Sequence, residues 1–503
     1  MSLPQEILLC ALGPSAPGGS GGIFLHDLQT GTQLASFKQT AASQHCTGVV
    51  PSSEGQGGVL LAAQPDKALC NVYSFQKDQV QQRIALPEKL SCLAIDPQAR
   101  FCAGGTSQGR LYFWEVASGI LFASFEAHYR AVTCCKFSDD GKALATASED
   151  SGISVWLVSS LLDEENQQSL PAAWWMPTDH TLAVTDLKFG MGAFPACRLF
   201  SVSLDMTCKV WDLTTKTLIT TFIFPAPLSL LALERTERTL FAASAEGEIF
   251  QMNLFRQKPG ARAGTLQAIG GGGGGEAVRL AEDGEEKRRI KVDQPLRSLA
   301  ISLTSALLLA GTSTGTINIY DLSSHQLLRA INTHRGYSIN TLLTMLRPAD
   351  LVGHAQAGFG SREEGVPGRT VAAFQRVRDG RARERHEVPM MLLALDDVGP
   401  EPPLPSITEQ ALQYHPSFLS TLPALASGDP TSLPSLQTRV SDLEAELSRL
   451  RSQLGRAKGV NDAMWETVVK TVLTGEGGKV NGDGAVNGEE EGGRRKRQRT
   501  VAA

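Results

Sequence analysis

Residues Thr207–Phe222 read TCKVWDLTTKTLITTF, and the architecture of most of the chain can be worked out from this stretch. An apolar run ends in a Trp-Asp pair, a polar turn follows, and a second apolar run completes a hairpin pattern. The pattern occurs seven times, and the residues at the Trp position are His26, Tyr73, Trp114, Trp156, Trp211, Met252 and Tyr320. The shorter separations, 41 and 42 residues, match the roughly 40–45 residues of a four-stranded propeller blade.

Within one repeat, strand patterns alternate with turn signals. In residues 131–156, AVTCCKF, ALATAS and ISVW read as strands, and Asp140-Gly141 marks a hairpin turn. One such sheet leaves a face exposed, so the sheets are expected to stack around an axis. The first repeat lacks an innermost strand, and an extra strand pattern, SINTLLTML, follows the seventh at Ser338–Leu346. We therefore predict an all-β, seven-bladed propeller over residues 1–346, in which this last strand completes the first blade.

Two insertions lengthen the connections between repeats. The first, residues 161–177, contains Trp174-Trp175, which either packs on the ring or contacts a partner; packing is the favoured interpretation. The second, residues 256–292, contains six consecutive glycines at Gly270–Gly275. This composition predicts a flexible surface loop.

The pattern changes after residue 346. Residues 347–434 are rich in Gly, Pro and Arg and are expected to form an extended linker; its apolar island, residues 388–395, is either core or a partner-binding segment. Residues 435–473 are predicted to form a C-terminal helix. The favoured interpretation is that its first part forms a coiled coil with another chain, either a different protein or a second copy of this one. The alternative is that the helix packs on its own propeller. The predicted pairing seam contains Leu436, Val440, Leu443, Leu447, Leu450 and Leu454.

The remaining residues, 474–503, are predicted to be a disordered tail with a basic cluster near its end. The cluster contains Arg494, Arg495, Lys496, Arg497 and Arg499. A cluster of this length indicates a nuclear localisation signal or a nucleic-acid contact, and the alternative is a solvated tail; the nuclear signal is the favoured interpretation. The chain as a whole has a net charge of −5 and a pI of about 6.0, so it is not a globally basic nucleic-acid-coating protein.

The composition also limits compartment and metal chemistry. No secretory leader and no membrane-spanning stretch are recognisable. The nine cysteines include no C-x-x-C pair, so a finger-type or ribbon-type zinc site is not supported. We expect an intracellular protein with reduced, buried thiols, and we predict no metal and no cofactor.

Three stretches match the nucleophile pattern G-x-S-x-G, at Gly18–Gly22, Gly105–Gly109 and Gly311–Gly315. The first lies in a Gly-rich turn and is interpreted as a chance match, so the other two need an explanation. Ser107 and Ser313 each lie seven residues before the Trp position of their repeat, so both belong to the same turn of equivalent blades. A catalytic elbow needs a helix after the turn, and no helical pattern follows either serine. We predict that the protein is not an enzyme.

The chain resembles the WD-repeat family. The resemblance rests on the motifs KVWDL, YFWEV and NIYDL and on His128, His180 and His334, each of which precedes a strand pattern. The resemblance implies a structural network of His, Ser or Thr, Asp and Trp within a blade. It assigns His180, Ser203, Asp205 and Trp211 to one such network, and His128, Ser148, Asp150 and Trp156 to another. His26, Tyr73 and Met252 depart from the pattern at the Trp position.

A narrower resemblance rests on the degenerate propeller, TMLRPADLVG at Thr344–Gly353 and the C-terminal leucine heptads. Together they resemble the WD-repeat subunit of the nuclear complex that processes the second internal transcribed spacer of ribosomal RNA precursors, the WD repeat-containing protein eighteen family. The resemblance implies a nuclear, non-catalytic scaffold in large ribosomal subunit assembly. The partners that it implies are a helical-repeat scaffold subunit, a further subunit, precursor large subunits, a midasin-type ATPase and a second copy. The alternative is a WD-repeat substrate receptor of a ubiquitin ligase or a chromatin scaffold.

Overall fold

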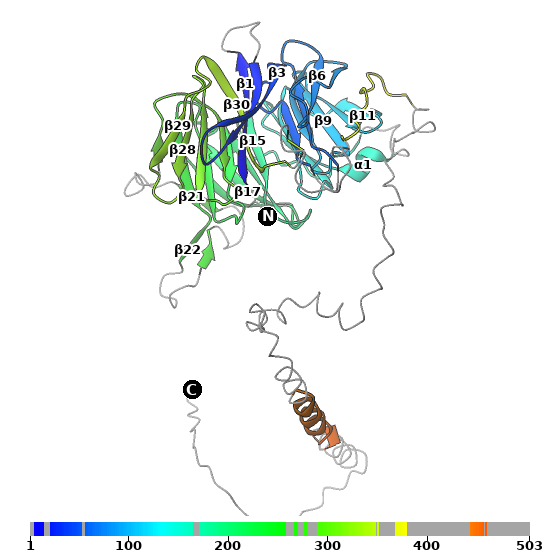
Figure 1. Ribbon diagram of the computed structural model, residues 1–503, viewed down its shortest axis with the longest axis vertical. Helices are drawn as coiled ribbons and strands as arrows, with labels where there is room; N and C mark the ends of the chain where they lie inside the picture. Colours follow the sequence, from blue (N-terminus) through cyan, green and yellow to red (C-terminus); the bar gives the residue numbers. More distant parts are fainter. Residues whose placement is uncertain are drawn as a thin grey trace, which may run out of the picture. The chain divides into compact units, whose positions relative to one another are not determined.

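The computed structural model describes residues 5–14, 21–52, 56–163, 171–257, 266–269, 276–279, 289–348, 350–351, 368–379, 443–456 and 458–459. The chain divides into two units, Met1–Met391 and Leu392–Ala503. The first unit holds every strand of the described part of the chain (Figure 1). The described part of the second is a helical segment.

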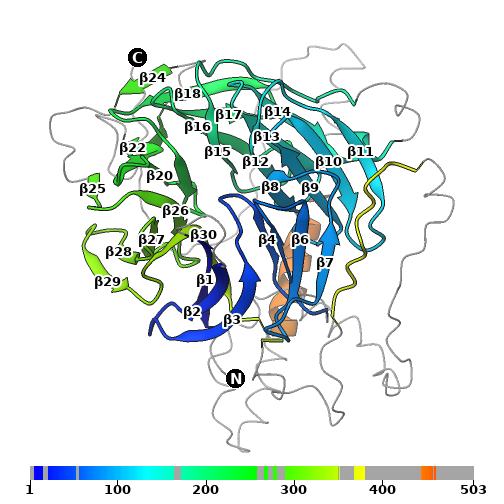
Figure 2. The same cartoon turned by 90° about the horizontal axis from the view of Figure 1, so that it is seen from above.

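Seven sheets form the ring of the first unit, and Figure 2 shows them arranged around a common centre. Neighbouring strands within these sheets run antiparallel, apart from one added parallel strand in blade 5. Blade 1 consists of β30 (Tyr337–Leu346), β1 (Glu6–Pro14), β2 (Gly21–Asp27) and β3 (Gln33–Thr40). Blade 2 consists of β4 (Thr47–Val50), β5 (Val59–Ala63), β6 (Leu69–Ser74) and β7 (Gln82–Ala85). Blade 3 consists of β8 (Leu90–Ile95), β9 (Phe101–Thr106), β10 (Arg110–Glu115) and β11 (Leu121–Glu126).

The remaining blades follow in chain order. Blade 4 consists of β12 (Val132–Phe137), β13 (Ala143–Ser148) and β14 (Ile153–Leu157), followed by α1 (Val158–Leu162). Blade 5 consists of β15 (Val184–Phe189), β16 (Arg198–Ser203), β17 (Thr207–Asp212), β18 (Thr217–Ile223) and the parallel β24 (Glu276–Arg279). Blade 6 consists of β19 (Leu230–Leu233), β20 (Thr239–Ala243), β21 (Glu248–Asn253) and β25 (Arg289–Lys291). Blade 7 consists of β26 (Leu296–Ile301), β27 (Leu307–Thr312), β28 (Ile317–Asp321) and β29 (Leu327–Ile331).

Apolar side chains between neighbouring sheets hold the ring together. The strands read as short apolar runs because both sheet faces are covered; all six residues of β13, for example, are buried. Phe125 of blade 3 meets Trp156 of blade 4 edge to face, with ring centroids 4.8 Å apart. Burying one such aromatic ring stabilises the fold by about 1.5–3 kcal/mol. The predicted seven-bladed propeller is confirmed.

The ring closes by pairing strands from its two chain ends. β30 lies antiparallel to β1, with Cys10 opposite Leu342, and it forms the innermost strand of blade 1. On its other side, the Ser298 hydroxyl of β26 donates a hydrogen bond to the Ile339 carbonyl at 2.8 Å. The prediction that Ser338–Leu346 completes the first blade is therefore confirmed.

The two insertions differ in how far they follow the prediction. Trp174 and Trp175 pack on the ring: Trp175 lies edge-on to Trp211 at 5.4 Å, and its carbonyl accepts a bond from Val155 N at the open edge of blade 4. The second insertion is not simply a loop. Its described parts form β24 and β25. They also form a hairpin of β22 (Phe255–Gln257) and β23 (Leu266–Ala268), in which β22 begins one residue before the insertion. Composition missed these strands because each has only three or four residues.

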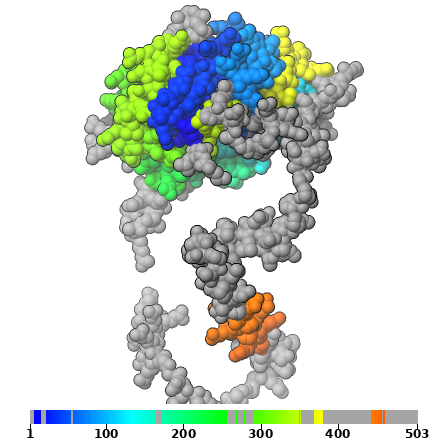
Figure 3. Space-filling view, viewed as in Figure 1, coloured from blue at the N-terminus to red at the C-terminus, as the bar shows by residue number. Residues whose placement is uncertain are grey.

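Residues 368–379, assigned to the linker by the sequence, lie against blades 2 and 3. Arg369 donates hydrogen bonds to the carbonyls of Gly57 and Gln98, at 3.2 and 2.6 Å. The segment appears in yellow at the surface of the first unit in Figure 3. The propeller therefore has an additional strap that the repeats do not encode.

The second unit contains a helix over residues 443–456, within the predicted helical region. Leu443, Leu447, Leu450 and Leu454 are all more than half exposed. Leu436 and Val440 lie outside the described residues, so the pairing seam stays a prediction. In the described part of the chain, no helix is long and apolar enough to cross a bilayer.

Ring closure can be tested by placing a charge in β30. Ile339 is fully buried, and Tyr337 of the same strand is 41% exposed. We expect Ile339→Asp to lower the free energy of unfolding by about 3–5 kcal/mol, because it buries an unpaired carboxylate. Urea denaturation followed by tryptophan fluorescence measures the change. Tyr337→Asp is the matched control, and an equal loss from both variants would contradict the importance of β30 for the stability of the ring.

Candidate functional site: the polar networks of the blades

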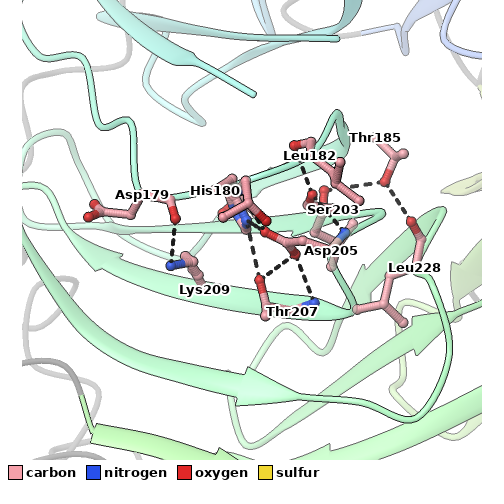
Figure 4. A network of polar contacts seen from close by, with 12 residues as sticks. Asp179, His180, Leu182, Thr185, Ser203, Asp205, Thr207, Lys209 and Leu228 are labelled. Atoms are coloured by element: carbon pink, nitrogen blue, oxygen red, sulfur yellow. Dashed lines mark hydrogen bonds and ion pairs between the residues drawn. The ribbon is translucent and has the colours of Figure 1, made fainter. Parts of the chain in front are cut away.

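A chain of hydrogen bonds links loop, sheet and core in blade 5 (Figure 4). His180, which precedes β15, places Nδ1 2.9 Å from Asp205 Oδ2 and Nε2 2.8 Å from the Ser201 hydroxyl. The same hydroxyl accepts the Trp211 indole N–H at 2.9 Å. Thr207 adds a 2.6 Å bond from its hydroxyl to Asp205. A buried polar group without a hydrogen-bond partner destabilises the fold, and this network gives partners to the imidazole of His180 and the indole N–H of Trp211.

The same arrangement recurs in blade 4. His128 lies 3.3 Å from Asp150 through Nδ1 and 2.8 Å from the Thr146 hydroxyl through Nε2. The Trp156 indole N–H donates to this hydroxyl at 3.2 Å. His, Asp and Trp therefore meet in both blades as the resemblance implied.

The hydroxyl residue of each network was assigned two positions too late. Ser203 donates instead to the Leu182 carbonyl and accepts from Asp205 N, at 3.0 and 3.2 Å. Ser148 likewise donates to the Arg130 carbonyl at 3.2 Å. Residues two apart on a strand face the same side, and Ser201 and Ser203 are both serines, so spacing alone did not separate them. The separating signal is strand register: Trp211 pairs with Leu199, two residues before Ser201.

Both network aspartates are held ionised. Burial opposes the charge on Asp205, but hydrogen bonds from His180 and Thr207 outweigh it and hold the pKa of the carboxyl well below its usual range. Burial likewise opposes the charge on Asp150, and bonds from His128 and the Gly152 amide again lower the pKa of the carboxyl. These carboxylates also fix the adjoining loops, because Asp205 accepts Thr181 N and Asp150 accepts Tyr129 N.

The blade 5 network has the acid, imidazole and hydroxyl of a hydrolytic triad, but it does not present them to a substrate. Ser201 is fully buried, and its oxygen already accepts the Trp211 indole N–H. A substrate carbonyl would need open space beside that oxygen. The arrangement therefore serves the stability of the blade.

The G-x-S-x-G motifs at Ser107 and Ser313 are explained by backbone geometry. Gly109 and Gly315 end the turns that contain Ser107 and Ser313, with φ of +84° and +91°. A Cβ at these positions would lie 2.0 and 1.9 Å from the carbonyl oxygens of His128 and His334. Close backbone approach and positive φ require the glycines, so the motif needs no catalytic explanation.

The networks position exposed apolar side chains on the face of the ring where the network histidines lie. Leu182, Leu204 and Met206 flank the blade 5 network and are 41–53% exposed; Tyr129, next to His128, is 99% exposed. The loops that carry them are tied to Asp205, Asp150 and Ser203 by the bonds given above. Exposed apolar residues on rigid loops are typical of protein-binding surfaces.

Blade 3 satisfies its tryptophan by a different route. Gly104 stands where blade 5 has Ser201, so no hydroxyl is available beside Trp114. The Trp114 indole N–H instead donates to the Gln375 carbonyl at 3.0 Å, and Phe374 stacks on the indole with ring centroids 5.2 Å apart. The strap of residues 368–379 thus replaces the missing network, a contact that the repeat pattern gave no sign of.

Blade 1 brings together a third kind of cluster. His26, at the Trp position, places Nε2 2.7 Å from His334 Nε2, and Cys10 Sγ lies 3.7 Å from the same atom. Burial lowers the pKa of His26, and burial together with His26 lowers the pKa of His334 to about 4, so both rings are neutral. Burial raises the pKa of Cys10 to about 12.

The centre of the ring is lined by ionisable residues that lie on the inner strands or just before them. His45 Nε2 lies 3.9 Å from Asp186 Oδ1, and Lys136, Lys188 and Arg297 line the same space. Burial lowers the pKa of His45 to about 4 and also lowers that of Lys188. Asp186 is fixed by bonds from the backbone amides of Leu187 and Leu231, so this cluster ties inner strands of neighbouring blades together.

Three predicted functional segments lie outside the described residues. They are the apolar island at 388–395, the seam positions Leu436 and Val440, and the basic cluster Arg494, Arg495, Lys496, Arg497 and Arg499. All nine cysteines lie within the described part, where each is free and buried.

The chain matches a known repeat family over the length of one repeat and is similar to curated proteins over most of its length. The WD domain, G-beta repeat family matches residues 119–156. The chain is 30% identical to the pre-rRNA-processing protein IPI3 of Mycosarcoma maydis, over 86% of this chain and 89% of that protein. It is also 30% identical to the IPI3 protein of Yarrowia lipolytica, over 87% and 95% of the two chains. The bovine WD repeat-containing protein 18 is 27% identical over 90% and 96%.

The register of the blade 5 network can be tested with two alanine variants. Ser201→Ala leaves His180 Nε2 and the Trp211 indole without a partner, so we expect a loss of about 1–3 kcal/mol for each group. Ser203→Ala removes only bonds at the turn, and we expect about 1 kcal/mol. Thermal and urea unfolding of both variants measures the difference. A larger loss of stability from Ser203→Ala than from Ser201→Ala would show that Ser203 is the network hydroxyl.

Asp205 also gives a pH-dependent prediction. Its pKa is lower in the folded chain than in the unfolded chain, so its contribution is fully present above the unfolded value of about 3.9. The contribution is lost as pH falls toward the folded pKa. Asp205→Asn should therefore be less stable than the native chain at pH 7, and the difference should shrink at pH 3. Urea midpoints at both values test this, and a constant difference would contradict it.

Proposed function

Since the chain belongs to the family of the pre-rRNA-processing protein IPI3, we propose that it works in the processing of ribosomal RNA precursors. In this proposal it is a non-catalytic scaffold subunit of a nuclear complex that matures the large ribosomal subunit and removes an internal transcribed spacer. The observation that carries the proposal is the likeness to pre-rRNA-processing proteins over 86–87% of the chain.

Each part of the chain has a separate role in this proposal. Residues 1–346 form the rigid scaffold, and the exposed residues beside the networks, such as Tyr129 and Leu182, support a docking role for it. Residues 347–434 connect it to a pairing helix in residues 435–473. The tail, residues 474–503, directs the protein to the nucleolus and nucleoplasm through its basic cluster.

The proposed partners follow from the family resemblance. They are a helical-repeat scaffold subunit and a further subunit of the same complex, the precursor large ribosomal subunit, a midasin-type ATPase and a second copy of this chain. A scaffold without catalysis is supported by the buried network hydroxyls and by the turn geometry of the G-x-S-x-G motifs at Ser107 and Ser313.

Affinity purification from nuclear extract tests the proposal. We expect the tagged full chain to recover precursor large subunits, measured as spacer-containing RNA and large-subunit proteins. The same chain without residues 435–473 should lose complex subunits while its propeller stays folded. Recovery of ubiquitin-ligase subunits or histones without ribosomal precursors, in both samples, would overturn the proposal.

Self-pairing through the helix has its own test. Leu443 and Leu447 are exposed and belong to the predicted seam, so Leu443→Asp with Leu447→Asp would put charges between paired helices. We expect the double variant to be monomeric at concentrations where the native chain pairs. Sedimentation velocity of the full chain measures the change.

The matched control carries the same charges on the outer side of the helix. Ala445→Asp with Ser448→Asp adds two carboxylates at positions outside the seam. This variant should pair as the native chain does. Pairing that survives the seam substitutions, or that fails equally in both variants, would exclude the helix as the specific interface.

A further inference from the structure

Three side chains that bind transition metals meet inside blade 1. Cys10 comes from β1, His26 from β2, and His334 from the connection ahead of β30. Cys10 and His26 are fully buried, and His334 is 5% exposed. Their ligand atoms, one sulfur and two imidazole nitrogens, all lie within 4.8 Å of one another. In the described part of the chain this is the one such group of three or more.

The cluster occupies the positions of the blade 5 network. His26 pairs with Leu8 as Trp211 pairs with Leu199, and Cys10 follows Leu8 by two residues as Ser201 follows Leu199. His334 precedes β30 as His180 precedes β15. Blade 1 has therefore kept the histidine and replaced the hydroxyl by a thiol and the indole by a second imidazole.

This replacement changes what the three positions can bind. An indole N–H only donates a hydrogen bond, whereas a neutral imidazole has a lone pair on one ring nitrogen. His26 Nδ1 faces the Gly31 carbonyl at 3.4 Å. A histidine that donates from one nitrogen to a backbone carbonyl presents the other nitrogen as a ligand, the usual second-shell arrangement at metal sites. The lone pair of His26 Nε2 then points toward His334 and Cys10.

We propose that Cys10, His26 and His334 bind a single Zn²⁺ or Cu⁺ ion inside blade 1. Thiolate and imidazole are the ligands that both ions prefer. Three ligands in a buried site suit a three-coordinate Cu⁺, or Zn²⁺ with one further ligand. The Cys10 proton is released to solvent as the metal–sulfur bond forms, so binding strengthens as pH rises.

The geometry requires only a small adjustment. The 2.7 Å between the two Nε2 atoms is a hydrogen-bond distance, as expected for the metal-free cluster. Two zinc–nitrogen bonds of about 2.0–2.1 Å at a tetrahedral angle separate the nitrogens by about 3.3 Å. The two rings must therefore move apart by roughly 0.6 Å, within the reach of small side-chain rotations.

The position of the ion gives it a structural consequence. Cys10 and His26 belong to the first two strands of the chain, and His334 leads into the strand that closes the ring. An ion bound by all three links the two ends of the propeller inside the closing blade. We therefore infer that metal binding stabilises ring closure, as a ligand of the folded state does.

Metal titration of the purified, chelator-treated full chain tests the inference. Separate arms use Zn²⁺ and Cu⁺, each competed against a chromogenic chelator, and Co²⁺ reports thiolate ligation through its charge-transfer absorption. We expect one ion per chain and a higher melting temperature with metal. Cys10→Ser should lower the affinity at least tenfold and abolish the cobalt–thiolate band.

Blade 5 supplies the matched control. Cys10→Ser combined with His26→Trp rebuilds the His, hydroxyl and indole set of that blade, so we expect this variant to fold, bind no ion and melt at the same temperature with and without metal. Cys197→Ser, a thiol of blade 5 outside the cluster, should bind as the native chain does. Less than a tenth of an ion per native chain in both arms, or equal binding by native chain and Cys10→Ser, would overturn the inference.

Discussion

Both faces of each of the seven blades must be covered, and only a closed ring covers them all. A four-stranded sheet leaves apolar side chains on two faces, and each blade covers one face of its neighbour, as Phe125 of blade 3 does with Trp156 of blade 4. A linear stack would leave the outer faces of blades 1 and 7 in water. The pairing of β1 with β30 removes both ends at once, and it obliges the first and last parts of the propeller to fold together.

A second constraint recurs from blade to blade: the buried polar group at the Trp position needs a hydrogen-bond partner. Blades 4 and 5 provide a hydroxyl between indole and imidazole, and blade 3 provides a carbonyl from residue Gln375, far along the chain. Blade 1 provides an imidazole pair beside a thiol. One position in the repeat therefore accepts chemically different solutions, because what must be satisfied is the buried donor and not a fixed residue type.

The period of the Trp position, the turn at Asp140-Gly141 and the missing inner strand of the first repeat were enough to predict the ring and its closure. They depend on local alternation and spacing, which a sequence shows directly. The network hydroxyl was misassigned because Ser201 and Ser203 share a strand face, and only pairing with Trp211 separates them. The strap was missed because Phe374 has no periodic context, and its role exists only beside Trp114.

The proposed scaffold role fits the contrast between the two units. In the propeller, Asp205 and Asp150 hold the loops that present exposed apolar residues. Because these loops are already ordered in the free protein, a partner that binds them loses little affinity to conformational entropy. In the helix, Leu443, Leu447, Leu450 and Leu454 remain exposed, and an apolar stripe of this kind is stabilised only when another surface covers it. A rigid ring and a helix that needs a partner are together suited to holding other proteins in a fixed arrangement, which is the work of a scaffold.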